Sequence, residues 1–330
     1  MKLEMVGLSD VGVVRQYNED NYRILFEEGV ALVCDGMGGH KGGALASDIA
    51  VKTIAEVYQS PSDELSERIA SDVESAYRKK FAKAVSAIRL ANRHIYILAA
   101  QNAKFKNMGT TAVLVGFEEG HAVIANVGDS RLYRLREREL QQLTEDHSWV
   151  NELIADREIR KEDARHFERK NVITRALGMT SSVKIDLRIE PIQIGDLFLL
   201  CTDGLSNALN DDLIQAVVSN YQDDIKTAAR QLIDLAKKAD GSDNITVALI
   251  KVVDAGNPTN CYEPFCLKLD AENARISTLE NKILKKQFGK STLKDQRGIS
   301  TFFKSKRFFI MLFIILLSLA VITICIKLIR

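Results

Sequence analysis

Four aspartates in this sequence share one kind of setting, in which a carboxylate lies at a strand end or in a tight turn. Asp35 and Asp203 each follow an apolar run and precede a glycine, whereas Asp20 and Asp243 lie in polar turns. Hard divalent cations prefer oxygen ligands, and several carboxylates gathered in one place repel one another strongly unless a cation neutralises them. With five histidines in the chain and no competing Cys/His spacing, the pattern favours Mg²⁺ or Mn²⁺ over zinc.

The stretch 30–43 places one of these carboxylates where a ligand can reach it. Five apolar residues from Val30 to Cys34 predict a short buried strand, and a turn rich in glycine follows Asp35. Glycine allows the backbone to approach a ligand closely. Residues 44–58 carry apolar side chains at helical spacing, so Asp35 is predicted at a strand-to-helix junction, a common place for a site. Taken alone, the stretch also fits a tight turn with an exposed aspartate.

The elements that must position the carboxylates are grouped rather than strictly alternating. A short polar connection at 118–120 joins two predicted strands and suits an antiparallel hairpin. Strands are expected at 3–8, 22–26, 30–34, 111–117, 121–127, 131–136, 184–190, 197–201 and 245–252, and helices at 44–58, 63–103, 211–219 and 224–239. This grouping favours an α+β fold with a largely antiparallel sheet.

The composition of the chain limits the kinds of protein to which it can belong. The chain has 330 residues, of which 46% are hydrophobic, so it can bury a substantial core in one large domain or two ordinary ones. The net charge of +1 hides an asymmetry, because residues 1–254 are acidic overall and residues 255–307 are basic. Five scattered cysteines do not form a disulfide framework, so we expect reduced core residues. Cys261 and Cys266 form a lone C-x4-C pair, which leaves a zinc site there as an alternative.

The last part of the chain predicts a membrane anchor. Residues 308–326 contain no charged side chain, and Lys304, Lys306 and Arg307 precede them. At a rise of about 1.5 Å per residue this run spans roughly 28 Å, close to the hydrocarbon thickness of a bilayer. We therefore predict a single transmembrane helix, with a buried core helix as the alternative. Residues 1–12 lack the apolar run of a signal peptide, so the simplest topology leaves residues 1–307 in the cytoplasm.

The basic residues 255–307 are expected to form a linker beside this anchor. Attraction to anionic lipid headgroups accounts for their charge, and a solvated linker is the alternative. Apolar residues from Leu269 to Ile283 fit a short amphipathic helix within it. A nucleic-acid enzyme is disfavoured, because the basic residues lie outside the predicted globular region.

Eight short motifs occur in one order along residues 3–252. They are Arg15-Gln-Tyr-Asn18-Glu19-Asp20, Asp35-Gly36-Met37-Gly38-Gly39-His40, Met108-Gly109-Thr110-Thr111, Val127-Gly128-Asp129-Ser130-Arg131, Asp146-His147-Ser148, Asn171-Val172-Ile173-Thr174-Arg175-Ala176-Leu177-Gly178, Cys201-Thr202-Asp203-Gly204-Leu205 and Gly241-Ser242-Asp243-Asn244-Ile245-Thr246. Together these motifs resemble the motif series of the metal-dependent PPM (type 2C) serine/threonine protein phosphatases, bacterial branch.

The resemblance implies a two-sheet, largely antiparallel β-sandwich flanked by helices (α-β-β-α), to which this chain adds one transmembrane helix. It also implies a binuclear Mn²⁺ or Mg²⁺ centre at one edge, with a third ion in bacterial members. Two such ions about 3.5–4 Å apart share a water and lower its pKa toward neutrality. The residues carried over as metal ligands are Asp20, Asp35, Asp203 and Asp243 through their side chains, Gly36 through its carbonyl, and Asp129, with Asp203, for the third ion.

Further residues are implied to handle the substrate. Arg15 matches the residue that holds the substrate phosphate, for which its planar fork is well suited. Residues 149–170 match the variable flap beside the active site. Met37 stands where some relatives carry a proton-donating histidine, so His40 and a metal-bound water are the candidates for the general acid; a turn-stabilising or exposed role is the alternative for His40.

These inferences predict three parts: a catalytic domain at 1–254, the basic linker and the membrane helix. The predicted activity is hydrolysis of phosphoserine and phosphothreonine on proteins, which reverses a cognate serine/threonine kinase at the membrane. The alternative is an inactive scaffold that binds phosphoproteins. The complete carboxylate set argues against a scaffold, because a pure binding module has no physical need for four mutually repelling acids.

Overall fold

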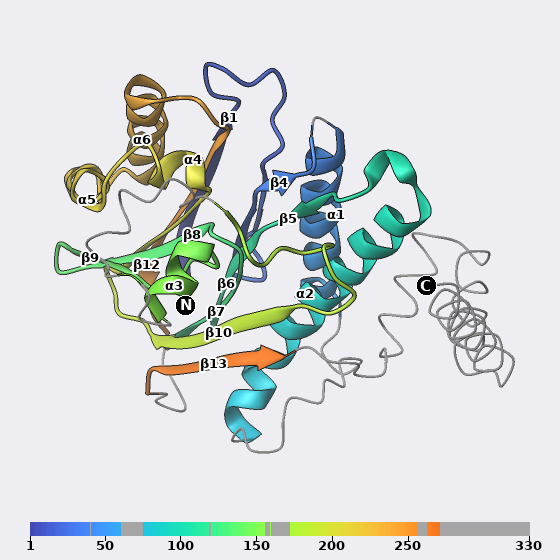
Figure 1. The fold of residues 1–330 in the computed structure, drawn as a ribbon. Helices are drawn as coiled ribbons and strands as arrows, with labels where there is room; N and C mark the ends of the chain where they lie inside the picture. Colours follow the sequence, from blue (N-terminus) through green and yellow to red (C-terminus); the bar gives the residue numbers. More distant parts are fainter. Residues whose placement is uncertain are drawn as a thin grey trace, which may run out of the picture. The chain divides into compact units, whose positions relative to one another are not determined.

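The strands of the described residues form two antiparallel sheets and one short pair. They are β1 (Lys2–Asp10), β2 (Asn21–Leu25), β3 (Val30–Cys34), β4 (Gly36–Met37), β5 (Gly109–Thr110), β6 (Ala112–Glu118), β7 (His121–Val127), β8 (Arg131–Arg136), β9 (Glu139–Gln142), β10 (Lys184–Pro191), β11 (Leu197–Cys201), β12 (Ile245–Asp254) and β13 (Phe265–Asp270). One sheet has the order β1-β12-β11-β8-β9 and the other β13-β10-β7-β6-β3-β2, while β4 pairs with β5 (Figure 1).

The computed structural model describes residues 1–39, 41–60, 75–118, 120–155, 159, 172–256 and 263–270. All of them belong to one compact unit, Met1–Arg275. The predicted transmembrane segment 308–326 and most of the predicted linker lie outside the described residues. Within the described ranges, no helix combines the length and apolar character needed to cross a bilayer.

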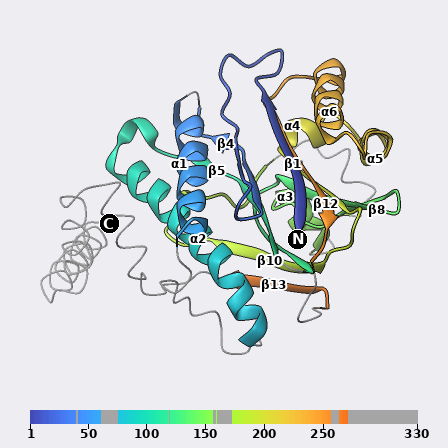
Figure 2. The ribbon, with the colours of Figure 1, turned by 180° about the vertical axis from the view of Figure 1, so that it is seen from behind.

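Helices cover the sheets on two sides. They are α1 (Lys41–Tyr58), α2 (Ser75–Gln101), the 3₁₀ turn η2 (Ala103–Phe105), α3 (Trp149–Ala155), α4 (Asp203–Ser206), α5 (Asp211–Asn220) and α6 (Ile225–Ala239). Figures 1 and 2 show α1 and α2 on one side of the strands and α5 and α6 on the other. Side-chain caps start the last two, since Asn210 accepts from Leu213 N–H and Asp224 accepts from Thr227 N–H.

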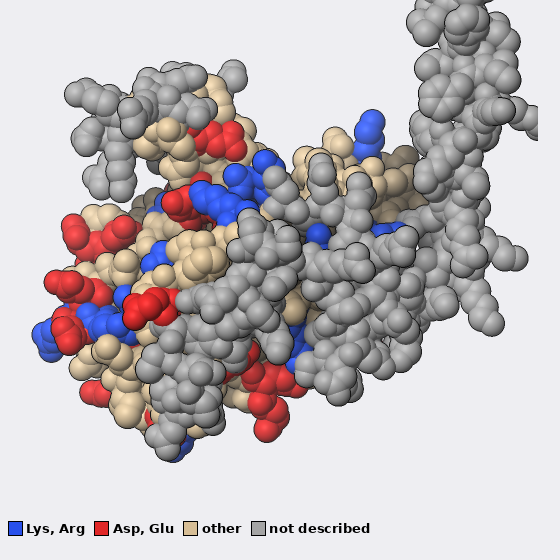
Figure 3. Space-filling model, turned by 90° about the horizontal axis from the view of Figure 1, so that it is seen from below, with Lys and Arg blue, Asp and Glu red and all other residues tan. Residues whose placement is uncertain are grey.

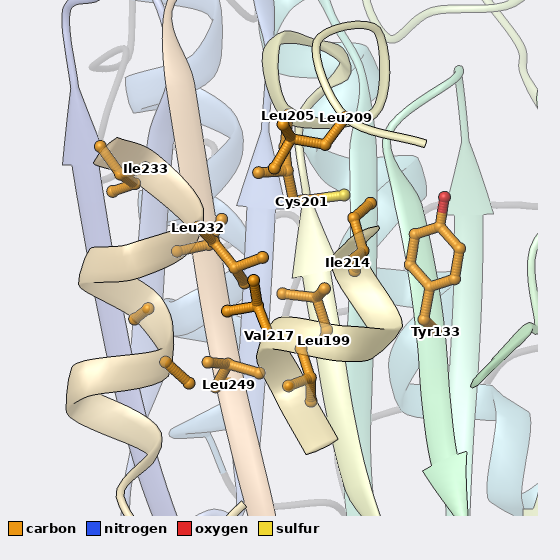
Figure 4. Close-up of a cluster of buried hydrophobic side chains, with 14 of the residues drawn as sticks. Tyr133, Leu199, Cys201, Leu205, Leu209, Ile214, Val217, Leu232, Ile233 and Leu249 are labelled. Atoms are coloured by element: carbon orange, nitrogen blue, oxygen red, sulfur yellow. The ribbon is translucent and has the colours of Figure 1, made fainter. Parts of the chain in front are cut away.

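The side chains of β11 point alternately into two apolar clusters, and this alternation explains how the layers pack. Leu199 and Cys201 point into a cluster with α5 and α6, which Figure 4 draws. Phe198 and Leu200 point the other way, into a second cluster shared by the two sheets. Successive strand residues face opposite sides, so a strand apolar on both sides must be covered on both. The expected α+β class with antiparallel sheets is confirmed.

The register brings several strand ends to one end of the sandwich. In the first sheet Cys201 pairs with Val247 and with Arg131, and in the second Cys34 pairs with Asn21. The turns that carry the predicted site residues follow or precede these positions. The sandwich therefore positions the site through its strand ends.

The structure corrects the expectation for the basic linker. Residues 265–270 form β13, which pairs with β10 from Lys184 to Ile189, so Leu269 lies in a strand and not in a helix. Leu269 is buried while Cys266 and Lys268 are exposed, a period of two that the surrounding basic sequence concealed. The ring of Phe265 lies 6.2 Å from that of Phe81 on α2, which anchors the strand.

The described cysteines carry free thiols, and the described surface carries charges of both signs. Cys34 and Cys201 are free and buried, as predicted, and Cys266 is free and exposed. Figure 3 shows acidic and basic side chains interspersed on the described part of one face. The flap expectation stays a prediction, since α3 covers 149–155 and most of 156–171 lies outside the described residues.

Candidate active site

Asp35 is fixed by its backbone at the end of β3. Its N–H donates to Thr111 Oγ1 at 2.8 Å, and its carbonyl accepts from Thr111 N–H and Thr110 Oγ1, both at 2.8 Å. Burial, and then the charges of Asp20, Asp203 and other acids nearby, raise the pKa of Asp35 well above its usual range. The carboxylate is thus held firmly at a place where its charge is unfavourable without a cation.

Asp20 is buried where the two sheets meet. Its Oδ2 accepts hydrogen bonds from Thr202 Oγ1 at 2.9 Å and Thr246 Oγ1 at 2.7 Å. Burial raises the pKa of Asp20 to about 7; the two threonine hydroxyls oppose this shift, and the charges of Asp203 and Asp243 add to it. Asp20 therefore belongs to the same electrostatic cluster as the other predicted ligands.

Asp203 opens the short helix α4, directly after β11. Its Oδ2 accepts from Asn207 Nδ2 at 3.0 Å. Burial and the charge of Asp243 raise the pKa of Asp203, while a hydrogen bond with Asp35 and the charge of Arg15 act in the opposite direction. The structure therefore brings Asp20, Asp35, Asp203 and Asp243 close enough for their charges to act on one another.

Arg15 joins this cluster from the loop between β1 and β2. Its Nη2 donates to Asp243 Oδ2 at 2.8 Å, and its Nε donates to the carbonyl of Ser242 at 3.3 Å. The Arg15 side chain remains 47% exposed, so part of the guanidinium faces solvent. An incoming anion can reach it there.

Asn244 holds the loop that carries Arg15, a role the sequence reasoning missed. Its Nδ2 donates to the carbonyls of Val11 at 2.9 Å and Tyr17 at 3.1 Å, and its Oδ1 accepts from Glu19 N–H at 2.8 Å. These bonds span both ends of the loop. The available signal in the sequence was the position of Asn244 directly after the predicted ligand Asp243.

Asp129 lies in the turn between β7 and β8. Its Oδ1 is buried and finds no hydrogen-bond partner among the described residues. Burial and then the charges of Asp203 and Asp146 raise the pKa of Asp129 to about 8. The turn therefore places Asp129 where the charge of Asp203 acts on it and where one of its carboxylate oxygens is buried without a partner in the described structure.

Gly36 and Glu19 meet beside Asp35. The N–H of Gly36 donates to the carbonyl of Glu19 at 3.2 Å, and Glu19 Oε1 is buried without a hydrogen-bond partner in the described structure. Glu19 stands next to Asp20 in the sequence, where Asp20 alone was predicted as a metal ligand. The buried oxygen of Glu19 adds a further acidic group at this place.

The general acid is not placed. His40 lies outside the described residues, and Met37 is half-buried in β4. Both expectations about proton donation therefore remain predictions.

The donor set fits a hard divalent cation. Within the described ranges, no three Asp, Glu, His or Cys side chains already stand where they could hold one metal ion. The gathered groups are nevertheless all oxygen donors, several have raised pKa values, and Glu19 and Asp129 each present a buried oxygen without a partner. A cation relieves each of these costs by neutralising the charges and supplying the missing partner.

Comparison with known proteins agrees with this chemistry. The profile of the family described as Protein phosphatase 2C matches residues 13–237. The serine/threonine phosphatase stp of Listeria monocytogenes is 37% identical over 247 residues, which cover 74% of this chain and 93% of that protein. The structure resembles serine/threonine phosphatase Stp1 from Staphylococcus aureus with a TM-score of 0.67 at 32% identity, covering 76% of this chain and 96% of that one.

A further solved structure bears on the metal. The catalytic domain of serine threonine protein phosphatase PstP, in complex with two manganese ions, matches with a TM-score of 0.64 at 30% identity, covering 76% of this chain and 99% of that one. The chain therefore belongs to the protein phosphatase 2C family and is a serine/threonine protein phosphatase that uses Mn²⁺ or Mg²⁺.

Proposed function

We propose that this phosphatase hydrolyses phosphoserine and phosphothreonine on proteins at the carboxylate cluster, with Arg15 holding the phosphate. In this proposal Asp20, Asp35, Asp203, Asp243 and the Gly36 carbonyl hold two ions, and Asp129 with Asp203 holds a third. When bound, the ions supply an activated water and neutralise charge on the phosphoryl oxygens. The observation that carries the proposal is the ion pair between Arg15 and Asp243, which joins a half-exposed anion-binding group to the carboxylate cluster.

The role of Arg15 follows from its geometry. Asp243 and the Ser242 carbonyl occupy two of its donor groups and hold the guanidinium plane in one orientation. The remaining donors form a fork that matches two phosphate oxygens. The loop around it is open, since Val13 and Val14 are 63% and 67% exposed. A phosphorylated side chain on the surface of a substrate protein can therefore reach the Arg15 guanidinium without entering a deep pocket.

Replacing Arg15 tests this role. Arg15→Ala is expected to lower kcat/KM for a phosphothreonine peptide by about 10–100-fold, because a hydrogen bond to a charged group contributes about 1.5–3 kcal/mol. Arg15→Lys keeps the charge beside Asp243 and loses the fork, so its loss should be intermediate. Steady-state kinetics at saturating Mn²⁺ measures both, with Arg230→Ala on the exposed side of α6 as the control. Unchanged kcat/KM in Arg15→Ala would contradict the assignment.

We further propose that the enzyme is a single-pass membrane protein with a cytoplasmic catalytic domain that opposes a serine/threonine kinase. The uncharged run 308–326 and its basic flanks support the anchor. The kinase follows from the reaction class, because phosphoserine and phosphothreonine in proteins are made by kinases.

Deletion of residues 302–330 tests the anchor. The shortened protein is expected in the soluble fraction after cell lysis, whereas the full chain should sediment with membranes. Its kcat/KM on a phosphothreonine peptide should match that of the detergent-solubilised full chain. A full chain that stays soluble would contradict the anchor, and lost activity would show that the tail does more than tether.

A further inference from the structure

Asp146 and His147 form hydrogen bonds to the two ends of the turn that carries Asp129. On one side, Arg131 Nη2 donates to Asp146 Oδ2 at 2.7 Å, and Arg131 Nε donates to Asp146 Oδ1 at 3.0 Å. On the other side, Gly128 N–H donates to His147 Nδ1 at 3.0 Å, and His147 N–H donates to the Gly128 carbonyl at 3.0 Å. Two consecutive residues thus hold the positions that flank Ser130 and Asp129.

The ring of His147 is oriented from both of its nitrogens. Because Nδ1 accepts the Gly128 N–H, the neutral ring carries its proton on Nε2. That nitrogen lies 3.3 Å from Asp186 Oδ2 and 3.2 Å from Arg175 Nη1, and Arg175 Nη1 donates to Asp186 Oδ1 at 3.0 Å. His147 is 5% exposed, so the ring is buried as well as bonded. It is therefore a rigid support for Gly128.

The turn needs such a support. Gly128 has a φ of +111°, and a Cβ on it would lie 2.6 Å from Thr111 Cβ, so both its conformation and its space are specific to glycine. Ser130 shares a hydrogen bond with Thr111 at 2.7 Å. Among the described residues no group holds Asp129 Oδ1, so the position of this oxygen depends on the backbone of the turn.

We propose that His147 is a positioning residue that sets the Gly128–Ser130 turn so that Asp129 binds the additional metal ion. The proposal rests on the proposed function, which gives Asp129 that ion together with Asp203. His147 reaches the ion only through Gly128 and Asp129. Replacement of a residue that orients a metal ligand typically lowers metal affinity by about 10–100-fold.

The same residue also sets the neighbouring backbone. The carbonyl of His147 accepts from Thr174 N–H at 2.9 Å, and Trp149 N–H donates to the Val172 carbonyl at 2.8 Å. The backbone of His147 is therefore bonded to Thr174 as well as to the Asp129 turn. Loss of its ring leaves these backbone bonds in place and removes the ring's contacts with Gly128, Asp186 and Arg175.

Calorimetric titration of the metal-free full chain with Mn²⁺ tests the proposal by a readout independent of activity. His147→Ala is expected to weaken the lowest-affinity Mn²⁺ site by about 10–100-fold and to leave the tighter sites in place. His147→Asn is the matched variant, because its Oδ1 can take the place of Nδ1 and accept from Gly128 while contact with Asp186 is lost. Its isotherm should stay close to that of the parent protein.

Two further variants make the test specific. In an Asp129→Asn background, His147→Ala should cause no additional loss, because the residue through which it acts is already changed. His94→Asn removes another buried histidine, which bonds Thr53 between α1 and α2, and should leave the Mn²⁺ isotherm unchanged. If His147→Ala does not fold, Asp146→Asn loosens the Arg131 side of the same turn and carries the same expectation.

Three results would overturn the proposal. They are an unchanged isotherm for His147→Ala, an equal weakening in His94→Asn, and an undiminished effect in the Asp129→Asn background. If the parent protein bound no Mn²⁺ and hydrolysed no phosphothreonine peptide, the proposed function would fail. If the parent did both and His147→Ala changed nothing, only this inference would fail.

Discussion

Asp35→Asn is expected to abolish Mn²⁺-dependent hydrolysis of a phosphothreonine peptide, and Asp203→Asn should do the same. Both carboxylates lie within the cluster, because the charges of Asp20 and Asp203 raise the pKa of Asp35 and the charge of Asp243 raises the pKa of Asp203. Loss of a charged ligand removes several kcal/mol of transition-state stabilisation, which corresponds to about 10³-fold or more in kcat/KM. Steady-state kinetics across a Mn²⁺ series measures the loss, and circular dichroism confirms the fold.

The same substitution should stabilise the protein when metal is removed. Asp35 has a pKa raised above its usual 3.8, so its folded form holds a proton more tightly than its unfolded form, and ionised Asp35 destabilises the fold. Metal-free parent protein is therefore expected to lose stability as the pH rises above about 4, through the range in which the buried acids ionise. An asparagine carries no charge, so Asp35→Asn in chelator should unfold at a higher temperature than the parent at pH 7.5.

Asp48→Asn is the matched control for both measurements. Asp48 pairs with Lys52 on the exposed side of α1, and a surface pair of this kind contributes little to stability. Its activity and its unfolding temperature should follow the parent protein. Full Mn²⁺-dependent turnover in Asp35→Asn and in Asp203→Asn would refute the ligand assignment, whatever happened to stability.

Gly36→Ala is expected to cause the second large effect, although it adds one methyl group. A Cβ on Gly36 would lie 2.2 Å from the carbonyl oxygen of Gly43 and 2.5 Å from that of Glu19. Both obstacles are backbone, so the chain itself must move, at a cost of about 3 kcal/mol in unfolding free energy. The movement displaces the carbonyl proposed as a metal ligand, and we expect kcat/KM to fall by about 10²-fold.

Gly116→Ala separates this effect from a general intolerance of alanine. A Cβ on Gly116, in β6, would make ordinary contacts of 3.5 Å with Val30 Cγ2 and 3.6 Å with the Tyr58 ring. Replacement there should leave stability within about 1 kcal/mol of the parent value. Urea unfolding and peptide kinetics compare the two variants. If Gly36→Ala matched the parent protein in stability and activity, the backbone around Gly43 would adapt to the methyl group, and the prediction would be wrong.

Strong periodic signals in the sequence predicted most of the sandwich. The apolar run before Asp35 became β3 from Val30 to Cys34, and the helix expected at 44–58 is α1, which begins at Lys41. Some short elements were missed because they lack an apolar run like that of β3. Thus β9 and α4 were not expected, and β13 lay hidden in a segment judged by its basic charge.

The candidate site was predictable where the chemistry lies in one residue and its neighbours. Asp20, Asp35, Asp203 and Asp243 could be selected because each carboxylate stands at a strand end or turn. The residues that hold these ligands in place could not be selected, because their roles depend on contacts between distant segments. Asn244 reaches Val11 and Tyr17 across more than two hundred residues, and His147 reaches Gly128 only once β7 and the loop after β9 lie side by side.

The strand β13 has a practical consequence for where this domain can be shortened. It occupies the outer edge of β10 from Lys184 to Ile189, so removal of residues 265–270 would leave that row of amide and carbonyl groups unpaired. Exposed sheet edges recruit strands from other molecules. A fragment ended near Asp254 is therefore prone to edge-to-edge association, whereas one that retains Asp270 carries its own protecting strand.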